Sequence, residues 1–381
     1  MPLDFIYTGF ENASPVNWEV DDDGIVHIKL LYDHERCSPN RAAGHWYVQL
    51  QGEAGTDITI MLENFYNVWN GRKSSPISDR TNCYISADGD SWSIIPAEKT
   101  SDNCLKFKVH LDTDKLYLAR LEPYRLSDLN RLIAEIREHP LVEVTKIGET
   151  VEGRELEIIR VGNLEAPYRV LLRARSHAWE PGGNWVVQGL IKTLLRDDDY
   201  AWQYLSKYCV YIMPMANKDG VARGYTRFNV MGKDLNRDWD RPADVRYAPE
   251  NHALENWMDG MVQAGMCPHL GIDLHNDNGG KLHLSRPENG SERYLDRMKH
   301  FESLMFQHTW FTEGSTGSNF RNPSTIGEGL FARYGTIACI LELNCDWIAG
   351  LNKPPFGEDW ELLGEQMCKV FLEYFDTEKE K

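Results

Sequence analysis

Two histidines and one glutamate have the residue types and the spacing of a metal site. His177 and Glu180 lie three residues apart, so a helical turn or a tight loop would aim an imidazole and a carboxylate at one point. His275 follows a short apolar run and could supply a second imidazole. Two nitrogens and one carboxylate oxygen form a ligand set of catalytic zinc, which keeps a further position for water. The alternative is structural, because His-x-x-Glu pairs also occur on ordinary helix surfaces.

Two further acidic residues lie close to apolar runs. Asp273 precedes His275 by two residues and could accept the N–H of an imidazole ring. Glu342 stands between Leu341 and Leu343, and a buried carboxylate without a partner is costly. It could therefore pair with an arginine or reach solvent. In the functional interpretation it faces the water activated by the metal and acts as a general base.

A long glycine-containing and arginine-rich stretch covers residues 217–227 and 233–239. Stretches of this kind often hold binding residues on a rigid scaffold. The planar fork of arginine suits a carboxylate, because it can donate to both oxygens at once. The stretch therefore indicates a carboxylate-binding loop, with surface salt bridges as the alternative.

The elements that must position these residues follow from four apolar runs that each end beside a polar cluster. The runs cover residues 170–172, 210–215, 270–272 and 337–341. Helical patterns cover residues 186–195, 253–262 and 362–375. Continuous apolar strands between helices predict a largely parallel sheet that is covered on both faces. Ligands bind beyond the carboxyl ends of such strands, so the polar clusters are expected to share one crevice.

Residues 1 to about 118 have a different pattern, in which short apolar or alternating runs are separated by turn clusters such as 21–24 and 87–90. Many short strands at this spacing predict an antiparallel β-sandwich. The pattern changes at residues 118–123, after which Ser127 could cap an amphipathic helix. We therefore expect two domains, residues 1–120 and 121–381, in a chain of the α/β class.

The composition is that of a globular protein with an excess of acid. Among 381 residues, 41 are Lys or Arg and 58 are Asp or Glu, which gives a formal net charge of −17. This balance argues against nucleic acid as a partner, because phosphate binding needs a basic surface. No apolar run predicts a membrane span, and the first residues show no export signal. The eight dispersed cysteines include no Cys-x-x-Cys pair, so we expect reduced thiols in the cytoplasm.

Taken together, these motifs resemble the zinc carboxypeptidase family, and within it the cytosolic carboxypeptidase branch. The resemblance rests on His-x-x-Glu, Asn-x-Asp-Gly, Asp-Leu-Asn-Arg-x-Trp, Asp-Leu-His and a late glutamate in a strand. It also includes Trp46-Tyr47-Val48 and the junction near Pro123, and so covers nearly the whole chain. The implied fold is an N-terminal antiparallel β-sandwich, followed by an α/β/α carboxypeptidase domain with a mixed, largely parallel central sheet.

By position, the resemblance implies one Zn²⁺ per chain, held by His177, Glu180 and His275. The loop departs from the common His-Pro-Gly-Glu pattern of the branch, because Ala178 and Trp179 fill its two middle positions. The spacing of the ligands is kept, whereas the shape of the loop and the width of the site's mouth are expected to differ.

The resemblance also implies the residues that meet the substrate. Asn236 and Arg237 match the pair that holds the terminal carboxylate, and Arg227 matches the arginine that polarises the scissile carbonyl and stabilises its oxyanion. Glu342 matches the general base. The implied reaction is hydrolysis of the C-terminal peptide bond of a peptide or protein. Two alternatives remain: a zinc amidohydrolase acting on an N-acyl amino acid or cell-wall peptide, and a non-catalytic module that binds a peptide carboxylate.

Two features of the implied site cannot be assigned by position. The family supplies a tyrosine upstream of the catalytic glutamate, for which Phe320 lies near the expected spacing and Tyr334 lies rather close to Glu342. Arg321 and Arg333 could favour an acidic C-terminal residue, or they could be surface charges. The oligomeric state and the role of the N-terminal domain stay open.

Overall fold

The computed structural model describes residues 3–284, 292–317 and 323–376, which form two compact units. The first unit runs to Leu126 and includes two later segments, His177–Trp179 and Lys218–Asp234, while the second comprises the remaining described residues. The domain boundary at residues 120 and 121 remains a prediction. None of the described helices combines the length and the apolarity that crossing a bilayer requires.

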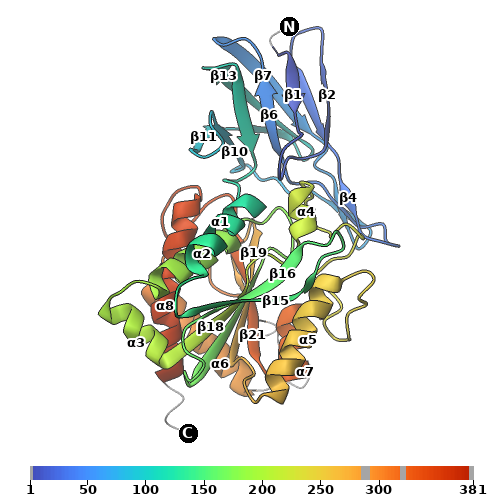
Figure 1. Cartoon of the computed structure of the whole chain (residues 1–381). Helices are drawn as coiled ribbons and strands as arrows, with labels where there is room; N and C mark the ends of the chain where they lie inside the picture. The colour runs from blue at the N-terminus through green and yellow to red at the C-terminus, as the bar shows by residue number, and fades with distance from the viewer. Residues whose placement is uncertain (1–2, 285–291, 318–322, 377–381) are drawn as a thin grey trace. The chain divides into compact units, whose positions relative to one another are not determined.

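Two five-stranded sheets form the main body of the first unit (Figure 1). One sheet has the order β1 (Phe5–Tyr7), β6 (Tyr47–Gln51), β14 (Lys115–Ala119), β10 (Asn82–Ser86), β11 (Ser93–Pro96). The other has the order β12 (Glu98–Ser101), β13 (Cys104–Leu111), β7 (Thr56–Glu63), β3 (Val26–Leu30), β2 (Val16–Val20). One hydrophobic cluster joins both sheets, so the predicted sandwich is confirmed. It is antiparallel except that β3 and β7 run parallel.

A small sheet and a segment from the middle of the chain complete the first unit. The sheet contains β4 (Asp33–His34), β5 (Arg41–Ala42), β8 (Asn67–Trp69) and β9 (Arg72–Ser74). The segment contains α4 (Lys218–Ala222) and the loop that continues to Asp234. Gly224 in this loop has a φ of +64°, and a Cβ there would lie 2.0 Å from the carbonyl oxygen of Ala13. Only glycine allows the backbone to approach so closely.

The second unit is organised around a seven-stranded mixed sheet. Its order is β15 (Val142–Glu149), β16 (Glu155–Val161), β18 (Tyr208–Met213), β17 (Tyr168–Ala174), β19 (Leu270–Asp277), β21 (Ile337–Asn344), β20 (Leu282–His283). The four central strands, from β18 to β21, are parallel and correspond to the four predicted apolar runs. The edge pairs are antiparallel, so the sheet is parallel only at its centre.

Helices cover this sheet on both faces (Figure 1). They are α1 (Leu126–Ile136), α2 (Gly182–Leu194), α3 (Asp199–Lys207), α5 (Pro249–Gln263), α6 (Glu292–His308), α7 (Ile326–Tyr334) and α8 (Gly357–Asp376). α2 and α8 pack together against one face, and α5 and α7 share a hydrophobic cluster with the other. Two of the three predicted helical patterns lie inside α5 and α8, and the third, residues 186–195, lies in α2 except for its last residue, Leu195, which is the C-cap. Ser127 does not cap α1, because the helix already begins at Leu126.

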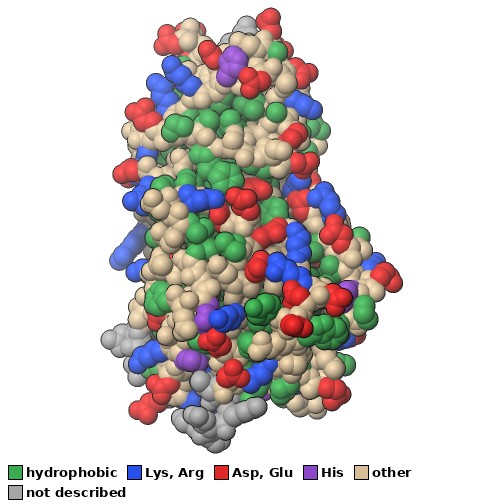
Figure 2. Space-filling model, turned by 90° about the vertical axis from the view of Figure 1, so that its left-hand side faces the viewer, with side chains coloured by type: hydrophobic (Ala, Val, Ile, Leu, Met, Phe, Trp, Pro, Cys, Tyr) green, Lys and Arg blue, Asp and Glu red, His purple; other side chains and the backbone are tan. Residues whose placement is uncertain are grey.

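Charged side chains of both signs share the visible surface, and most cysteines are buried. Figure 2 shows acidic side chains interspersed with basic ones over the face in view, with no single-sign block. All eight cysteines are free thiols, and only Cys37 is exposed.

Candidate metal centre and active site

A strained turn after β17 leads into the segment that carries His177 and Glu180. Arg175 has a φ of +60°, a left-handed conformation that is uncommon outside glycine and turns the chain sharply. The backbone N–H of Asn217 donates to its carbonyl at 2.9 Å, and its own buried guanidinium donates to Asn184 at 3.3 Å. The turn is therefore fixed from both the backbone and the side chain.

The start of α2 fixes the position of Glu180 relative to β19. The N–H of Gly182 donates to the side-chain oxygen of Asn276 at 2.9 Å. A Cβ on Gly183 would lie 2.8 Å from the Cβ of Leu274, so the helix approaches the strand as closely as two backbones allow. Because His275 lies between Leu274 and Asn276, this close packing brings Glu180 beside His275.

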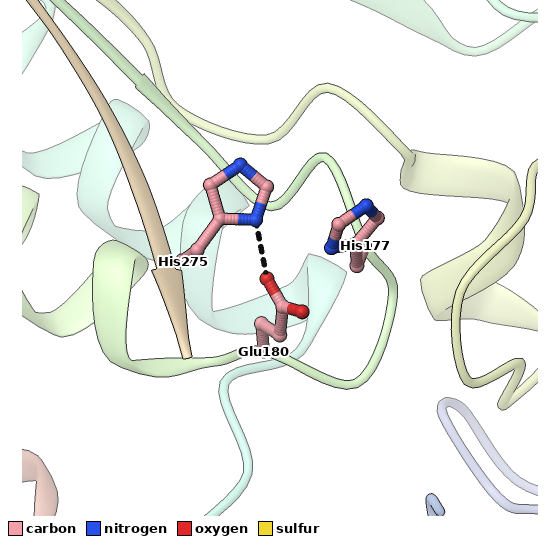
Figure 3. A group of neighbouring side chains, drawn as sticks. All are labelled: His177, Glu180 and His275. Atoms are coloured by element: carbon pink, nitrogen blue, oxygen red, sulfur yellow. Dashed lines mark hydrogen bonds and ion pairs between the residues drawn. The ribbon is translucent and has the colours of Figure 1, made fainter. Parts of the chain in front are cut away.

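The three expected ligands form one buried group (Figure 3). The ligand atoms of His177, Glu180 and His275 all lie within 4.8 Å of one another, and the residues are 3 %, 3 % and 1 % exposed. Glu180 Oε2 lies 2.8 Å from His275 Nδ1. Two imidazole nitrogens and a carboxylate oxygen converging in a buried place suit a zinc ion, so the residues present fit the metal.

His275 is held by a carboxylate on the side away from Glu180. Its Nε2 lies 2.6 Å from Asp273 Oδ2, which is the contact between imidazole and carboxylate expected from the sequence. Asp273 is in turn 3.4 Å from the Arg173 guanidinium and accepts from Ser176 at 3.3 Å. Burial alone would lower the pKa of His275, but Asp273 and Glu180 outweigh it and raise that pKa well above its ordinary value. The ring orientation is thus set by a buried network.

His177 has an equivalent carboxylate partner in Asp234. Its Nε2 lies 3.2 Å from Asp234 Oδ1, and Asp234 is completely buried. The other oxygen, Oδ2, accepts from Arg227 Nε at 2.9 Å and lies 2.8 Å from its Nη2. Each imidazole therefore has its Nε2 on a carboxylate, so Nδ1 is the nitrogen that a metal would take. Asp234 also connects a predicted ligand to the predicted oxyanion-binding arginine.

Glu342 lies beside His275 in the central sheet. The two residues are register partners in the parallel pair of β19 and β21, so their side chains share one face. Glu342 is half-buried and belongs to a second group with Asp277 and His283, whose ligand atoms lie within 4.8 Å of one another. Burial lowers the pKa of His283 and favours its neutral form. This edge of the sheet therefore carries two sets of titratable side chains. His177, Glu180 and His275 are buried, whereas Asp277, His283 and Glu342 are half-buried.

The Asn236–Arg237 pair follows Asp234 after one intervening residue, Leu235. Asn236 is buried, its side-chain oxygen accepts from the backbone of Ile326 at 3.1 Å, and its Nδ2 lies 3.3 Å from His275 Nε2. Arg237 is half-exposed and donates to the carbonyl of Asn236 at 2.7 Å. The Asn236 amide is thus fixed by Ile326, and the Arg237 guanidinium is held by the backbone of Asn236.

The remaining candidates have structural contacts or lie outside the described residues. Tyr334 packs in the hydrophobic cluster of α5 and α7, and burial raises its pKa to about 12. Arg333 forms an ion pair with Glu255 and donates to backbone carbonyls. Phe320 and Arg321 lie outside the described residues.

Sequence reasoning missed two residues of the site. Asp234 begins the Asp-Leu-Asn-Arg motif. Its position could have indicated a role, because an acidic side chain so near a carboxylate-binding pair needs a positively charged or hydrogen-bonding partner of its own. His283 lies on the short edge strand β20, opposite Ile340 of β21. A two-residue strand leaves no periodic pattern, so nothing in the sequence pointed to it.

Comparisons with known proteins agree with this geometry. Residues 129–261 match the family model of the zinc carboxypeptidases, Peptidase_M14. Cytosolic carboxypeptidase 6 of Caenorhabditis elegans is 30 % identical over 172 residues, covering 42 % of this chain and 37 % of that protein. An uncharacterised protein of Zymomonas mobilis is 28 % identical over 307 residues, covering 77 % of this chain and 78 % of that protein.

The fold is shared with solved bacterial structures. A metallo-carboxypeptidase from Burkholderia cenocepacia superimposes with a TM-score of 0.86 at 22 % identity, covering 98 % of this chain and 99 % of that one. The fold of this chain is therefore the one found in bacterial metallo-carboxypeptidases. The chain is thus similar to the zinc carboxypeptidases over residues 129–261, and the proteins that it resembles include cytosolic carboxypeptidases. It spans 37 % of the worm relative's length and 12 % of that of human cytosolic carboxypeptidase 4.

Proposed function

We propose that the protein is a zinc-dependent metallocarboxypeptidase that hydrolyses the C-terminal peptide bond of peptides or proteins. The observation that carries this proposal is the buried group of His177, Glu180 and His275 with a carboxylate behind each imidazole. These residues would hold one Zn²⁺ per chain. When bound, zinc supplies a Lewis acid and makes water acidic enough to lose a proton near neutral pH.

Glu342 is the general base of the proposed reaction. It takes a proton from the attacking water and passes it to the amine of the leaving residue. Its register with His275 supports this role, because it places the carboxylate on the face that carries a metal ligand. Its half-buried position beside Asp277 and His283 suits a carboxylate that must gain and lose a proton during each turnover.

Arg227 stabilises the oxyanion that develops on the scissile carbonyl. Asp234 accepts from its Nε and also contacts its Nη2, and these two contacts fix the plane of the guanidinium. Removing one such donor typically costs about 10²–10³-fold in kcat. Arg227→Ala is therefore expected to lower kcat. The same substitution at a surface arginine should leave kcat unchanged.

Asn236 and Arg237 bind the terminal carboxylate of the substrate. A charged, bidentate donor beside a fixed amide recognises a free carboxylate and rejects a neutral amide end. Peptides with an amidated C-terminus should therefore not be cut, although their sequence is unchanged. Rapid cleavage of amidated peptides would contradict this assignment.

The decisive experiment compares Glu342→Gln with the wild type on a library of free-acid peptides. Mass spectrometry records loss of the C-terminal residue, and atomic absorption records zinc per chain. We expect turnover to fall about 10²–10⁴-fold with zinc retained. Glu358→Gln is the matched control, because its side chain is 81 % exposed in α8. Turnover of the Glu342 variant near the wild-type rate would overturn the proposal.

The same assay separates the alternatives. Hydrolysis of N-acyl amino acids or cell-wall peptides, with no release from ordinary peptide ends, would identify an amidohydrolase. Tight binding of peptide acids by the zinc-loaded protein, with no turnover, would identify a binding module. A peptide or protein C-terminus is the partner that the proposed chemistry requires.

Two finer points are also proposals. We propose a preference for acidic C-terminal residues, which the arginines at 321 and 333 would provide; the ion pair of Arg333 with Glu255 weakens the contribution of the second. We also place the protein in the cytoplasm, supported by relatives named cytosolic carboxypeptidases. A library enriched in basic or bulky apolar ends among its fastest substrates would contradict the first point.

A further inference from the structure

We propose that Asp33, on the small sheet of the first unit, is a positioning residue for Arg227. It acts by fixing the backbone of residues 226–228, from which the arginine side chain extends. The inference rests on the proposed function of Arg227, and it gives the N-terminal part of the chain a role in the reaction.

Asp33 binds three consecutive backbone N–H groups of the arginine loop. Its Oδ1 accepts from Thr226 at 2.9 Å, and its Oδ2 accepts from Arg227 at 2.8 Å and Phe228 at 2.7 Å. Burial raises the pKa of the Asp33 carboxyl, and the three backbone donors oppose that rise. One carboxylate thus replaces the backbone carbonyl acceptors that these N–H groups would have in a helix or a strand. It restricts the conformations of the backbone that carries Arg227.

Other N-terminal residues fix the same loop at its flanks. Thr226 Oγ1 accepts from the backbone N–H of Gly44 at 3.1 Å and of His45 at 3.2 Å. The side chain of Asn12 donates to the carbonyl of Val221 at 3.0 Å. The loop is therefore built on the first residues of the chain, although it follows them by about 200 positions in the sequence.

The side chain of Arg227 is oriented from two directions. Its guanidinium carbon lies 4.7 Å from the centre of the ring of Trp69, which belongs to the same small sheet as Asp33. Its edge meets Asp234, which also contacts His177. A stacked and ion-paired guanidinium has few alternative rotamers, so a shift of the backbone beneath it would move the charge directly.

A cavity lies beside Asp33 and the arginine loop. A space of about 350 Å³ lies along the loop, and its lining includes Tyr32, Asp33, Tyr225 and Asn229. Tyr225 and Asn229 stand on either side of residues 226–228, so the packing of the loop is incomplete at both ends of the segment that Asp33 holds. Removing the carboxylate leaves the loop space into which it can relax.

The test combines kinetics with hydrogen exchange in Asp33→Asn. An asparagine keeps the size but offers only one acceptor oxygen. We expect kcat to fall between about 10-fold and 100-fold with KM nearly constant, because a misplacement of about 1 Å can cost 10²-fold. Zinc content stays unchanged. The amides of residues 226–228 exchange faster, which reports the loop without any use of activity.

Matched controls separate positioning from loss of structure. Asp57→Asn makes the same change at a carboxylate that is 85 % exposed in the first unit, and it should leave kcat and exchange unaltered. In an Arg227→Ala background, Asp33→Asn should have no further effect on kcat. Trp69→Leu, which removes the ring beneath the guanidinium, provides a second variant should Asp33→Asn fail to fold, and it too should lower kcat with KM nearly constant.

Two results would overturn the inference. One is an unchanged kcat together with faster exchange of residues 226–228 in Asp33→Asn, or in its place an unchanged kcat in Trp69→Leu. The other is a full additional loss of kcat in the Arg227→Ala background. A wild-type protein that cuts no peptide end while residues 226–228 respond as expected would instead refute the proposed function.

Discussion

The core of the β-sandwich and the carboxyl edge of the central sheet are both buried, yet they are filled differently. In the sandwich, apolar side chains such as Ile60, Leu62 and Phe107 form one cluster between two sheets. At the carboxyl edge, Asp273 and His275 occupy equally buried positions and are held by directional contacts. Apolar packing tolerates substitution, whereas a buried charge depends on one partner. The first region should fail by unfolding, and the second should lose metal or turnover while folded.

The largest effect is expected from His275→Ala, which removes a ligand and leaves Asp273 and Glu180 without the imidazole between them. Zinc should fall to trace levels after dialysis, and peptidase turnover should be lost. Metal analysis and the peptide assay measure both. His110→Ala, at a half-exposed histidine of the sandwich, should change neither. Full zinc retention in the His275 variant would show that the metal is held elsewhere.

Next in size is Leu62→Ala in the sandwich core, where the residue is 1 % exposed. Truncating a buried leucine typically costs about 2–5 kcal/mol through lost transfer energy and a cavity. Urea denaturation should show the loss, while kcat per folded molecule stays at the wild-type value. A stable variant with reduced kcat would erase the contrast between the two regions.

A smaller effect is expected from Asp273→Asn at the carboxyl edge. The amide keeps the shape but holds the His275 ring less strongly, and losing such a partner typically weakens metal affinity about 10–100-fold. Competition with a chromogenic chelator measures this affinity. Asp102→Asn is the control, because its carboxylate is 86 % exposed. Equal affinities for the two variants would mean that the Asp273 contact does not orient the ligand.

The smallest effect concerns His27, which lies 3.1 Å from both Asp21 and Glu63. The hydrogen bond to Asp21, followed by the contacts with Glu63, raises the pKa of His27 against the opposing effect of burial. Its contribution to stability is therefore complete below about pH 6.5 and is lost as pH rises through the raised value. We expect less than about 1 kcal/mol, because the site is partly exposed.

Urea midpoints of the wild type and His27→Asn, measured between pH 5 and 9, check this prediction. The difference between the two proteins should shrink towards high pH. A difference that grows with pH would reverse the assigned sign.

Sequence reasoning succeeded where local pattern and chemistry coincide. Each of the four central strands contains an apolar run; His177 and Glu180 lie in the segment after β17, and His275 lies within β19 just after its apolar run. The edge strand β15 was not predicted, because its residues alternate between half-buried and exposed and give no apolar run. Contacts between distant segments could not be predicted either. Asp33 accepts a hydrogen bond from the backbone of Phe228, 195 residues later, and neither segment contains a pattern that indicates this pairing.

The inclusion of Lys218–Asp234 in the first unit has a consequence for synthesis on the ribosome. After Asp33 leaves the exit tunnel, the chain must grow by another 195 residues before its partner Phe228 emerges. At about 5–20 residues per second this delay lasts on the order of 10–40 s. During that time the nascent sandwich lacks the segment that Asp33 binds and that contacts Ala13 through Gly224. Chaperone dependence of the newborn chain should therefore persist until residue 234 has emerged.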